Sequence, residues 1–320
     1  MKFAPSVYEH AARFLNKSPW QVSRDEELMY KAHAAAYEAY RHEPITIGID
    51  IYNLEAEAYG ATVDEPSGNN IPTIGKPLYQ SLDDLLQIQC FNPKTDGRLP
   101  LVIRAGKRVA EQFPQADVRI PVSGPFSIAS LLLPFETLLI ESFSDPQKVM
   151  RVLERLAENQ LAFCEEIHNA GLKITFFESA ATPPLVSPEQ FRTIIMPVLK
   201  EMIRNISTLT GENTALIIGG DTTPILESIL QTGAKYIICP SETDQKAFMQ
   251  KMRTAPDVMV RINMDPQIIA YGEWPELQNE IERVLAIAAE RHNVVIGTGV
   301  LPYDARPETV LKIQEYIHSL

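Results

Sequence analysis

The fold can be predicted from one stretch, residues 215–239, with the sequence ALIIGGDTTPILESILQTGAKYIIC. It begins with a β-branched run, Ala215–Ile218, and a Gly-Gly-Asp turn follows. A helix would begin near Thr223-Pro224 and end at Gly233, because proline favours the first helical turn and glycine the position after the last. A second apolar run, Tyr236–Cys239, follows at once. Both runs are apolar at consecutive positions, which is typical of parallel strands covered by helices.

The same pattern recurs along most of the chain. Short apolar runs alternate with helical stretches of ten or more residues, at residues 44–50, 118–124, 173–179, 215–221, 236–239, 258–263 and 293–299. This alternation favours a (β/α)8 barrel, one domain over residues 1–320, and the alternative is an open doubly wound sheet. We expect residues 1–43 to form a helical cap segment. The Gly-, Pro- and Asn-rich stretch Gly60–Pro77 predicts a long hairpin or loop.

Composition excludes several classes of protein. The chain has 320 residues, of which 45% are hydrophobic and 22% charged, so it can bury a large core. It has no apolar run of about 18 residues and no signal-peptide pattern at its start, and so no membrane segment is predicted. Three cysteines are too few for a disulfide framework, and we expect a cytoplasmic protein. The net charge of −12 argues against binding of nucleic acid or of an anionic membrane.

Candidate functional residues are those that follow the predicted strands, because the active site of such a barrel lies at the C-terminal ends of the strands. The carboxylates Asp50, Glu178 and Asp221 are the candidate catalytic residues. Asp50 ends an apolar run, so burial would raise its pKa and let it act as an acid. The candidate substrate-binding residues are Phe126, Phe177, Ser179, Cys239, Glu242, Asn263, Thr298 and Tyr303.

Each of these assignments has a structural alternative. Asp221 could cap the helix that follows it, Glu178 could belong to a buried network, and Cys239 could be a core thiol. The predicted mouth is acidic and contains none of the six histidines. No convincing metal site and no phosphate-binding glycine motif is found. From the residues alone, the chain is predicted to be a barrel enzyme with an acidic mouth.

Several of these segments together resemble the uroporphyrinogen decarboxylase superfamily. The matching segments span residues 44–320 in the order of the family, and are Gly48–Asn53, Gly124–Ser127, Phe177–Ser179, Ser187–Phe191, Gly220–Leu226, Asn263–Pro266 and Gly297–Gly299. The resemblance implies a TIM barrel with one of two activities. One branch decarboxylates porphyrinogens, and the other exchanges methyl groups with a corrinoid that a partner protein carries.

The match to the decarboxylase branch is partial. The aspartate that cradles the pyrrole N–H groups corresponds to Asp50, and the Glu-Ser pair of that branch corresponds to Glu178 and Ser179. Its arginine-rich N-terminal loop has no counterpart, and its active-site tyrosine and histidine fall on Leu131 and Thr298. A substrate with eight carboxylates needs cations, which the acidic mouth does not offer.

The methyltransferase branch fits better, although without its metal. Its thiol-specific members hold zinc through His-x-Cys and a later Cys, at positions that fall on Ile217, Gly219 and about Val300. The resemblance therefore implies a corrinoid-linked methyltransferase without zinc. It would take a methyl group from a small donor, such as a methoxylated aromatic, in an O-demethylation, and pass it to the cobalamin of a partner corrinoid protein. A porphyrinogen-type decarboxylase and a non-catalytic binding barrel are the alternatives.

Overall fold

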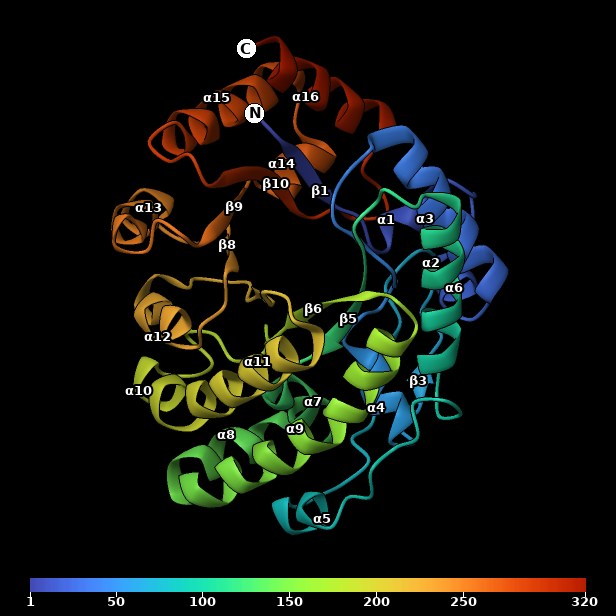
Figure 1. The fold of residues 1–320 in the computed structure, drawn as a ribbon, viewed down its shortest axis with the longest axis vertical. Coiled ribbons are helices and arrows are strands. Elements are labelled where there is room, and N and C mark those ends of the chain that lie inside the picture. The colour runs from blue at the N-terminus through green and yellow to red at the C-terminus, as the bar shows by residue number, and fades with distance from the viewer.

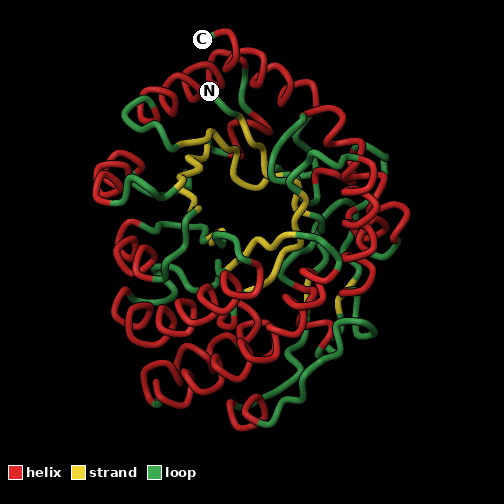
Figure 2. The backbone as a smooth tube through the Cα atoms, viewed as in Figure 1, coloured by secondary structure: helices red, strands yellow, loops and turns green.

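The computed structural model describes residues 1–320. Eight parallel strands form one curled sheet in the order β1-β10-β9-β8-β7-β6-β5-β2. The strands form a ring with helices around it, as Figures 1 and 2 show. They are β1 Phe3–Ser6, β2 Ile45–Thr46, β5 Val118–Ser123, β6 Lys173–Phe177, β7 Ala215–Ile217, β8 Tyr236–Cys239, β9 Met259–Asn263 and β10 Val294–Val300. The predicted barrel-type α/β fold is confirmed.

Helices connect successive strands and cover the outside of the sheet (Figure 1). The longer ones are α3 Glu26–Tyr40, α6 Leu99–Gln112, α7 Pro125–Leu132, α8 Phe135–Ser144, α9 Pro146–Asn169, α11 Met196–Thr210, α15 Trp274–Ala288 and α16 Pro307–Ser319. The shorter ones are α1 His10–Arg13, α2 Pro19–Ser23, α4 Asn53–Ala58, α5 Leu82–Leu86, α10 Pro188–Gln190, α12 Leu226–Gln231, α13 Gln245–Lys251 and α14 Pro266–Tyr271, with short turns η1 Phe191–Ile195, η2 Thr223–Ile225 and η3 Met252–Thr254. None of the helices is long and apolar enough to cross a membrane.

Two separate apolar clusters form because successive strand residues point to opposite faces. On β9, Val260 and Ile262 belong to the main core, which fills the space between the sheet and the helices. The second cluster is much smaller and lies inside the barrel. It comprises Tyr8, Ile51, Phe177, Ile217 and Ile238, with Tyr52 and Tyr236 packed against it. We call this set the interior cluster.

The N-terminal segment departs from the prediction. Helices α1, α2 and α3 lie within residues 1–43, as expected, but residues Phe3–Ser6 form β1, which pairs in parallel with β10. The sequence of this strand, Phe-Ala-Pro-Ser, contains no β-branched residue and includes a proline, so Phe3 is its one strand-favouring residue. Its position at the end of the sheet allows a proline, because one edge needs no donor.

The glycine-rich stretch between residues 60 and 77 forms the predicted hairpin. Two short antiparallel strands, β3 Val63–Asp64 and β4 Thr73–Ile74, pair within it. The predicted helix start at Ser187-Pro188 is also present. The Ser187 hydroxyl accepts a hydrogen bond from the Gln190 amide, and the Gln190 side chain accepts one from the Ser187 amide.

Candidate active site

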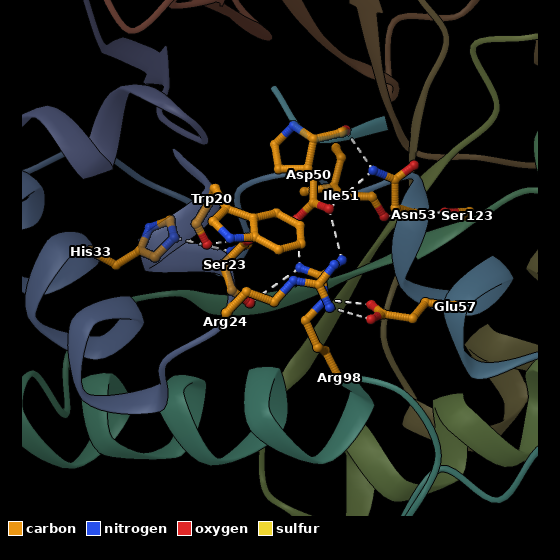
Figure 3. A network of polar contacts seen from close by, with 12 residues as sticks. Trp20, Ser23, Arg24, His33, Asp50, Ile51, Asn53, Glu57, Arg98 and Ser123 are labelled. Atoms are coloured by element: carbon orange, nitrogen blue, oxygen red, sulfur yellow. Dashed lines mark hydrogen bonds and ion pairs between the residues drawn. The ribbon is translucent and has the colours of Figure 1, made fainter. Parts of the chain in front are cut away.

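Asp50 lies in a buried ion pair. It follows β2, and both of its carboxylate oxygens accept hydrogen bonds of 2.7 Å from the guanidinium of Arg98, the N-cap residue of α6. Asn53, at the start of α4, donates to Asp50 Oδ2 at 3.0 Å (Figure 3). Arg98 also donates to Glu57, and Arg24 pairs with the other oxygen of Glu57. We call these five residues the Asp50 cluster.

The Asp50 cluster balances its own charge. Two carboxylates face two guanidinium groups, and Arg24 also lies over the ring of Trp20 with its charge centre 4.3 Å from the ring centroid. Burial works against the charge of Arg98, but Asp50 and Glu57 outweigh it and raise the Arg98 pKa. A two-pronged contact with arginine stabilises an ionised carboxylate. The geometry therefore makes Asp50 the partner of Arg98 in a buried ion pair.

Glu178 lies on the outer side of the barrel and caps a helix. Its Oε1 accepts hydrogen bonds from the amide and hydroxyl of Ser127, at 2.8 and 2.5 Å, and its Oε2 accepts from the Phe126 amide at 3.1 Å. A Cβ atom at Gly124 would overlap this carboxylate, so the glycine is required. Burial raises the pKa of Glu178 to about 7, although the Ser127 and Phe126 hydrogen bonds oppose the shift. Glu178 thus ties the first turn of α7 to the end of β6.

Ser179 faces the barrel interior. Its Oγ accepts a hydrogen bond of 2.5 Å from the Tyr52 hydroxyl and one of 3.2 Å from the Gly219 amide. Phe177, two residues earlier, is buried between Tyr8 and Tyr52, which meet it edge to face with centroids 5.9 and 6.0 Å away. Of the predicted residues, Phe177 therefore belongs to the interior cluster, and Ser179 lies beside it.

Asn263 and Arg261 face the same interior from β9. They alternate along the strand with Val260 and Ile262, which pack on the helix side. Both residues are buried, and Asn263 Oδ1 and Arg261 Nε have no hydrogen-bond partner in the protein. Arg261 was not predicted as a site residue. A charged residue within the run VMVRIN was a usable signal, because alternation places it opposite the core-facing positions.

Three of the other predicted residues are buried away from the interior cluster. Phe126 and Cys239 belong to the main core on the helix side of the sheet. Thr298 joins β1 to β10, since its Oγ1 accepts from the Ser6 amide at 3.0 Å and donates to the Gly299 carbonyl at 2.8 Å.

The remaining three predicted residues lie nearer the surface. Asp221 is exposed and accepts a hydrogen bond of 3.1 Å from the Thr223 amide, at the start of the turn η2. Glu242 is exposed beside Ser241. Tyr303 packs partly against the main core, with the charge centre of Arg13 5.8 Å from its ring centroid.

Two further buried carboxyl groups, Glu55 and Glu9, were not predicted as site residues. Glu55 in α4 accepts hydrogen bonds from the amide and hydroxyl of Ser123, at 2.6 and 2.9 Å. Glu9 follows Tyr8 directly. Burial raises the pKa of each of these carboxyls to about 7. Glu9 was not predicted because β1, the strand shortly before it, could not be recognised in the sequence.

The positions to which the resemblance assigns zinc ligands carry none here. Ile217 belongs to the interior cluster, Gly219 contributes its amide to Ser179, and Val300 ends β10. No group of three or more His, Cys, Asp or Glu side chains is placed to hold a metal ion. Burial lowers the pKa of His10 and His33 to about 4, which keeps these histidines neutral in the core. The residues present do not fit a zinc site of that type.

Comparison with known proteins gives two kinds of relatives. The chain is 26% identical to the methylated-thiol–coenzyme M methyltransferase of Methanosarcina mazei over 211 residues, 65% of this chain and 55% of that protein. It is 26% identical to the methylcobamide:CoM methyltransferase MtaA of Methanosarcina barkeri over 216 residues, 65% of this chain and 60% of that protein. It is 23% identical to the uroporphyrinogen decarboxylase of Salinispora tropica over 273 residues, 82% of this chain and 70% of that protein. The matched region thus spans little more than half of the methyltransferases' length.

A solved structure has the same fold. A methyltransferase from Methanosarcina mazei superposes with a TM-score of 0.84 at 19% identity, over 99% of this chain and 94% of that one. Residues 4–320 also match the family described as uroporphyrinogen decarboxylase (URO-D). The match covers almost the whole chain, including β1 and the segment before residue 44. The chain therefore belongs to the uroporphyrinogen decarboxylase family, as the ordered motifs predicted.

Proposed function

We propose that the protein is a corrinoid-linked methyltransferase. It would take a methyl group from a small donor other than a thiol, and pass it to the cobalamin of a partner corrinoid protein. The similarity to methyltransferases that act on methylated thiols and methylcobamide supports the reaction class. The side chains at Ile217, Gly219 and Val300 support a donor other than a thiol, because none of them can hold the zinc that would activate a thiol.

The observation that carries this proposal is the arrangement of Ser179. The Ser179 oxygen accepts hydrogen bonds from Tyr52 and Gly219. Its own O–H group can therefore donate a hydrogen bond to a ligand. Burial raises the pKa of Tyr52, which keeps that phenol protonated as a donor. The Ser179 hydroxyl is therefore held as an oriented hydrogen-bond donor beside the aromatic rings of the interior cluster.

An oriented donor of this kind suits the cleavage of a methyl ether. A reduced corrinoid on the partner protein would supply the nucleophile for the methyl carbon. The bond from carbon to oxygen breaks, its electron pair stays on the oxygen, and Ser179 donates a hydrogen bond to that oxygen as its negative charge develops. Phe177 and Tyr8 offer apolar surface against which the ring of an aromatic donor can be positioned.

The decarboxylase alternative lacks comparable support at Asp50. In the decarboxylases this aspartate would accept hydrogen bonds from pyrrole N–H groups. Here Arg98 engages both oxygens, and Asn53 donates to one of them as well. Removing these donors would leave the buried guanidinium of Arg98 with only Glu57 as a charge partner. A pyrrole cradle therefore competes with an ion pair that the fold already contains.

The test is a single-turnover methyl transfer. The protein is mixed with a corrinoid protein in the Co(I) state and a panel of methoxylated aromatics, and methyl-Co(III) is followed in the visible spectrum. We expect transfer from at least one donor and a loss of about 100-fold in the Ser179→Ala variant, as for other removed oxyanion donors. Ser130→Ala, which removes a hydroxyl bound to the Ser127 carbonyl, is the matched control. Turnover of uroporphyrinogen without cobalt methylation would favour the decarboxylase, and no response to any ligand would favour a binding protein.

A further inference from the structure

Arg261 is a buried cation without a protein counter-charge. The residue is only 5% exposed, yet no carboxylate lies within ion-pair distance of its guanidinium and no hydrogen bond joins it to the protein. Burying an unpaired charge is costly, and buried arginines in proteins are normally paired. Arg98 and Arg24, the other arginines described above, are both neutralised by Asp50 and Glu57. Arg261 is thus the charged group whose partner must come from elsewhere.

The side chain of Arg261 is directed along the inside of the barrel. A Cβ atom at Gly297, on the neighbouring strand β10, would lie 2.7 Å from Arg261 Cγ and Cδ, so the absence of a side chain there gives the arginine its room. Burial raises the pKa of the Tyr8 hydroxyl to about 12, and the nearby charge of Arg261 partly opposes this shift. The guanidinium therefore reaches across β10 towards the interior cluster.

Other polar atoms on the strands and segments that surround the barrel interior also lack partners. The buried oxygens Ser6 Oγ, Thr175 Oγ1, Tyr236 Oη and Asn263 Oδ1 make no hydrogen bond to the protein. A cavity of about 600 Å³ opens at the N-terminal ends of the strands and reaches Tyr236, Met259 and Val295. Val295 pairs with Arg261 in the sheet, and Met259 lies two residues before it on the same face. The cavity therefore reaches the layer of side chains next to Arg261 on the N-terminal side, although Arg261 itself does not line it.

An apolar wall lies at the same level as the cation. Ile238 pairs with Arg261 across β8 and β9, and Ile238 packs with Phe177 and Tyr8 in the interior cluster. Ser179 lies two residues beyond Phe177, which is roughly 7 Å further along the barrel. The interior thus presents a cation, an apolar wall and a hydroxyl donor in that order along the barrel, which is the order of groups in an aromatic ring that carries a carboxylate and a methoxy group.

We propose that Arg261 binds the carboxylate of the methyl donor, so that the substrate class is a small methoxylated aromatic acid. Arginine is suited to this role because its planar fork matches a carboxylate. One unpaired cation accounts for one acidic group, in contrast to the eight carboxylates of a porphyrinogen. This inference rests on the proposed function for the identity of the reacting group, but the anion site itself is tested by binding alone.

The binding test uses the full chain without any corrinoid protein. Methoxybenzoates, their demethylated hydroxybenzoates, the matching carboxamides and inorganic phosphate are titrated by calorimetry. We expect an aromatic carboxylate to bind at least tenfold more tightly than its carboxamide, and phosphate to bind weakly. Arg261→Gln should weaken carboxylate binding roughly 10- to 100-fold, the range for a lost charged hydrogen bond, and should leave carboxamide binding unchanged. Arg253→Gln, an exposed arginine paired with Glu290, is the control with the same change in charge.

Several results would overturn the anion site. They are equal affinity for the acid and its amide, no saturable binding of any carboxylate in the panel, or unchanged affinity in Arg261→Gln. Tighter binding of phosphate than of any aromatic acid would replace the carboxylate with a phosphorylated ligand. Failure of methyl transfer with intact, Arg261-dependent binding of carboxylates would reject the proposed function and retain the site, so that the two failures can be told apart.

Discussion

The Asp50 cluster and the interior around Arg261 are two polar regions of one barrel. They differ in whether their buried charges are paired with opposite charges of the protein. In the first, two guanidinium groups meet two carboxylates and Asn53 donates to Asp50, so that every charge has a counter-charge, although Arg24 Nε makes no hydrogen bond. In the second, Arg261 Nε and four oxygen atoms are buried without protein partners, and no carboxylate pairs with the guanidinium. Native proteins satisfy nearly all buried polar groups, so the exceptions need an explanation. The contrast supports the proposal that the first region stabilises the fold and that the second binds a ligand.

The largest expected effect is on the stability of the Asp50 cluster. Asp50→Asn keeps the shape of the side chain but removes the main counter-charge of a buried guanidinium. Breaking a buried pair in this way typically costs 3–5 kcal/mol, and because Glu57 remains we expect about 3 kcal/mol in the free energy of unfolding. Asp257→Asn, which breaks the exposed pair with Lys235, should cost at most about 1 kcal/mol. Chemical denaturation measures both.

A different outcome would return Asp50 to the catalytic residues. If Asp50→Asn unfolds like the unmodified protein and loses turnover by a hundredfold or more, the carboxylate acts on the substrate. The Asp50 cluster would then belong to the active site, and its contrast with the interior around Arg261 would no longer hold.

The second prediction concerns pH and the strand that leads to Asp50. His33 Nε2 accepts a hydrogen bond of 3.0 Å from the Gly48 amide, and burial lowers the pKa of His33 to about 4. In the unfolded chain the pKa is about 6.5, so between pH 6.5 and 4 the unfolded chain binds a proton that the folded one does not. Stability from this residue is therefore complete above pH 6.5 and is lost as the pH falls, by about 3 kcal/mol in all.

The variant His33→Gln isolates this contribution. Glutamine can accept the Gly48 hydrogen bond but does not titrate. Unfolding free energies of both proteins at pH 7 and pH 4.5 should show a smaller loss on acidification in the variant. Equal losses would mean that His33 is already protonated in the fold, or that it is not buried as described.

The third prediction is smaller and concerns the interior around Arg261. Tyr52→Phe removes one of the two donors that orient Ser179, while Gly219 still contributes its amide. We expect single-turnover methyl transfer to slow about tenfold and the free energy of unfolding to change by about 1 kcal/mol. Tyr30→Phe removes a surface hydroxyl bound to Gln112 and is the matched control. A transfer rate unaffected by Tyr52→Phe would separate Ser179 from the chemistry.

Much of the fold could be predicted from the sequence, because seven of the strands carry apolar runs. The exception, β1, is Phe-Ala-Pro-Ser, and its strand conformation comes from pairing with β10, almost 300 residues away. The residues after it, Tyr8 and Glu9, were missed for the same reason. Ordered family motifs located Phe177, which belongs to the interior cluster, and Ser179, which lies beside it.

The charge partners of the site residues were harder to predict than the positions of these residues in the fold. Asp50 was expected to be a desolvated acid, since the preceding residues are apolar. Arg98, 48 residues later, reverses that expectation, and no local pattern links the two. Glu178 was expected to face the mouth, but alternation from Phe177 turns it towards α7. An arginine within an apolar strand, as at Arg261, is the local signal that points to the second region.

The most direct test of the central contrast is the thermal unfolding of the Arg261→Met variant with and without an aromatic carboxylate. A ligand that binds the native state raises its melting temperature, and removing an unpaired buried charge does not lower it. We predict that the variant without ligand melts at or above the temperature of the unmodified protein, and that the carboxylate raises the melting temperature of the unmodified protein alone. A variant that melts several degrees lower and is still stabilised by the carboxylate would contradict the account, because Arg261 would then be part of the structural framework.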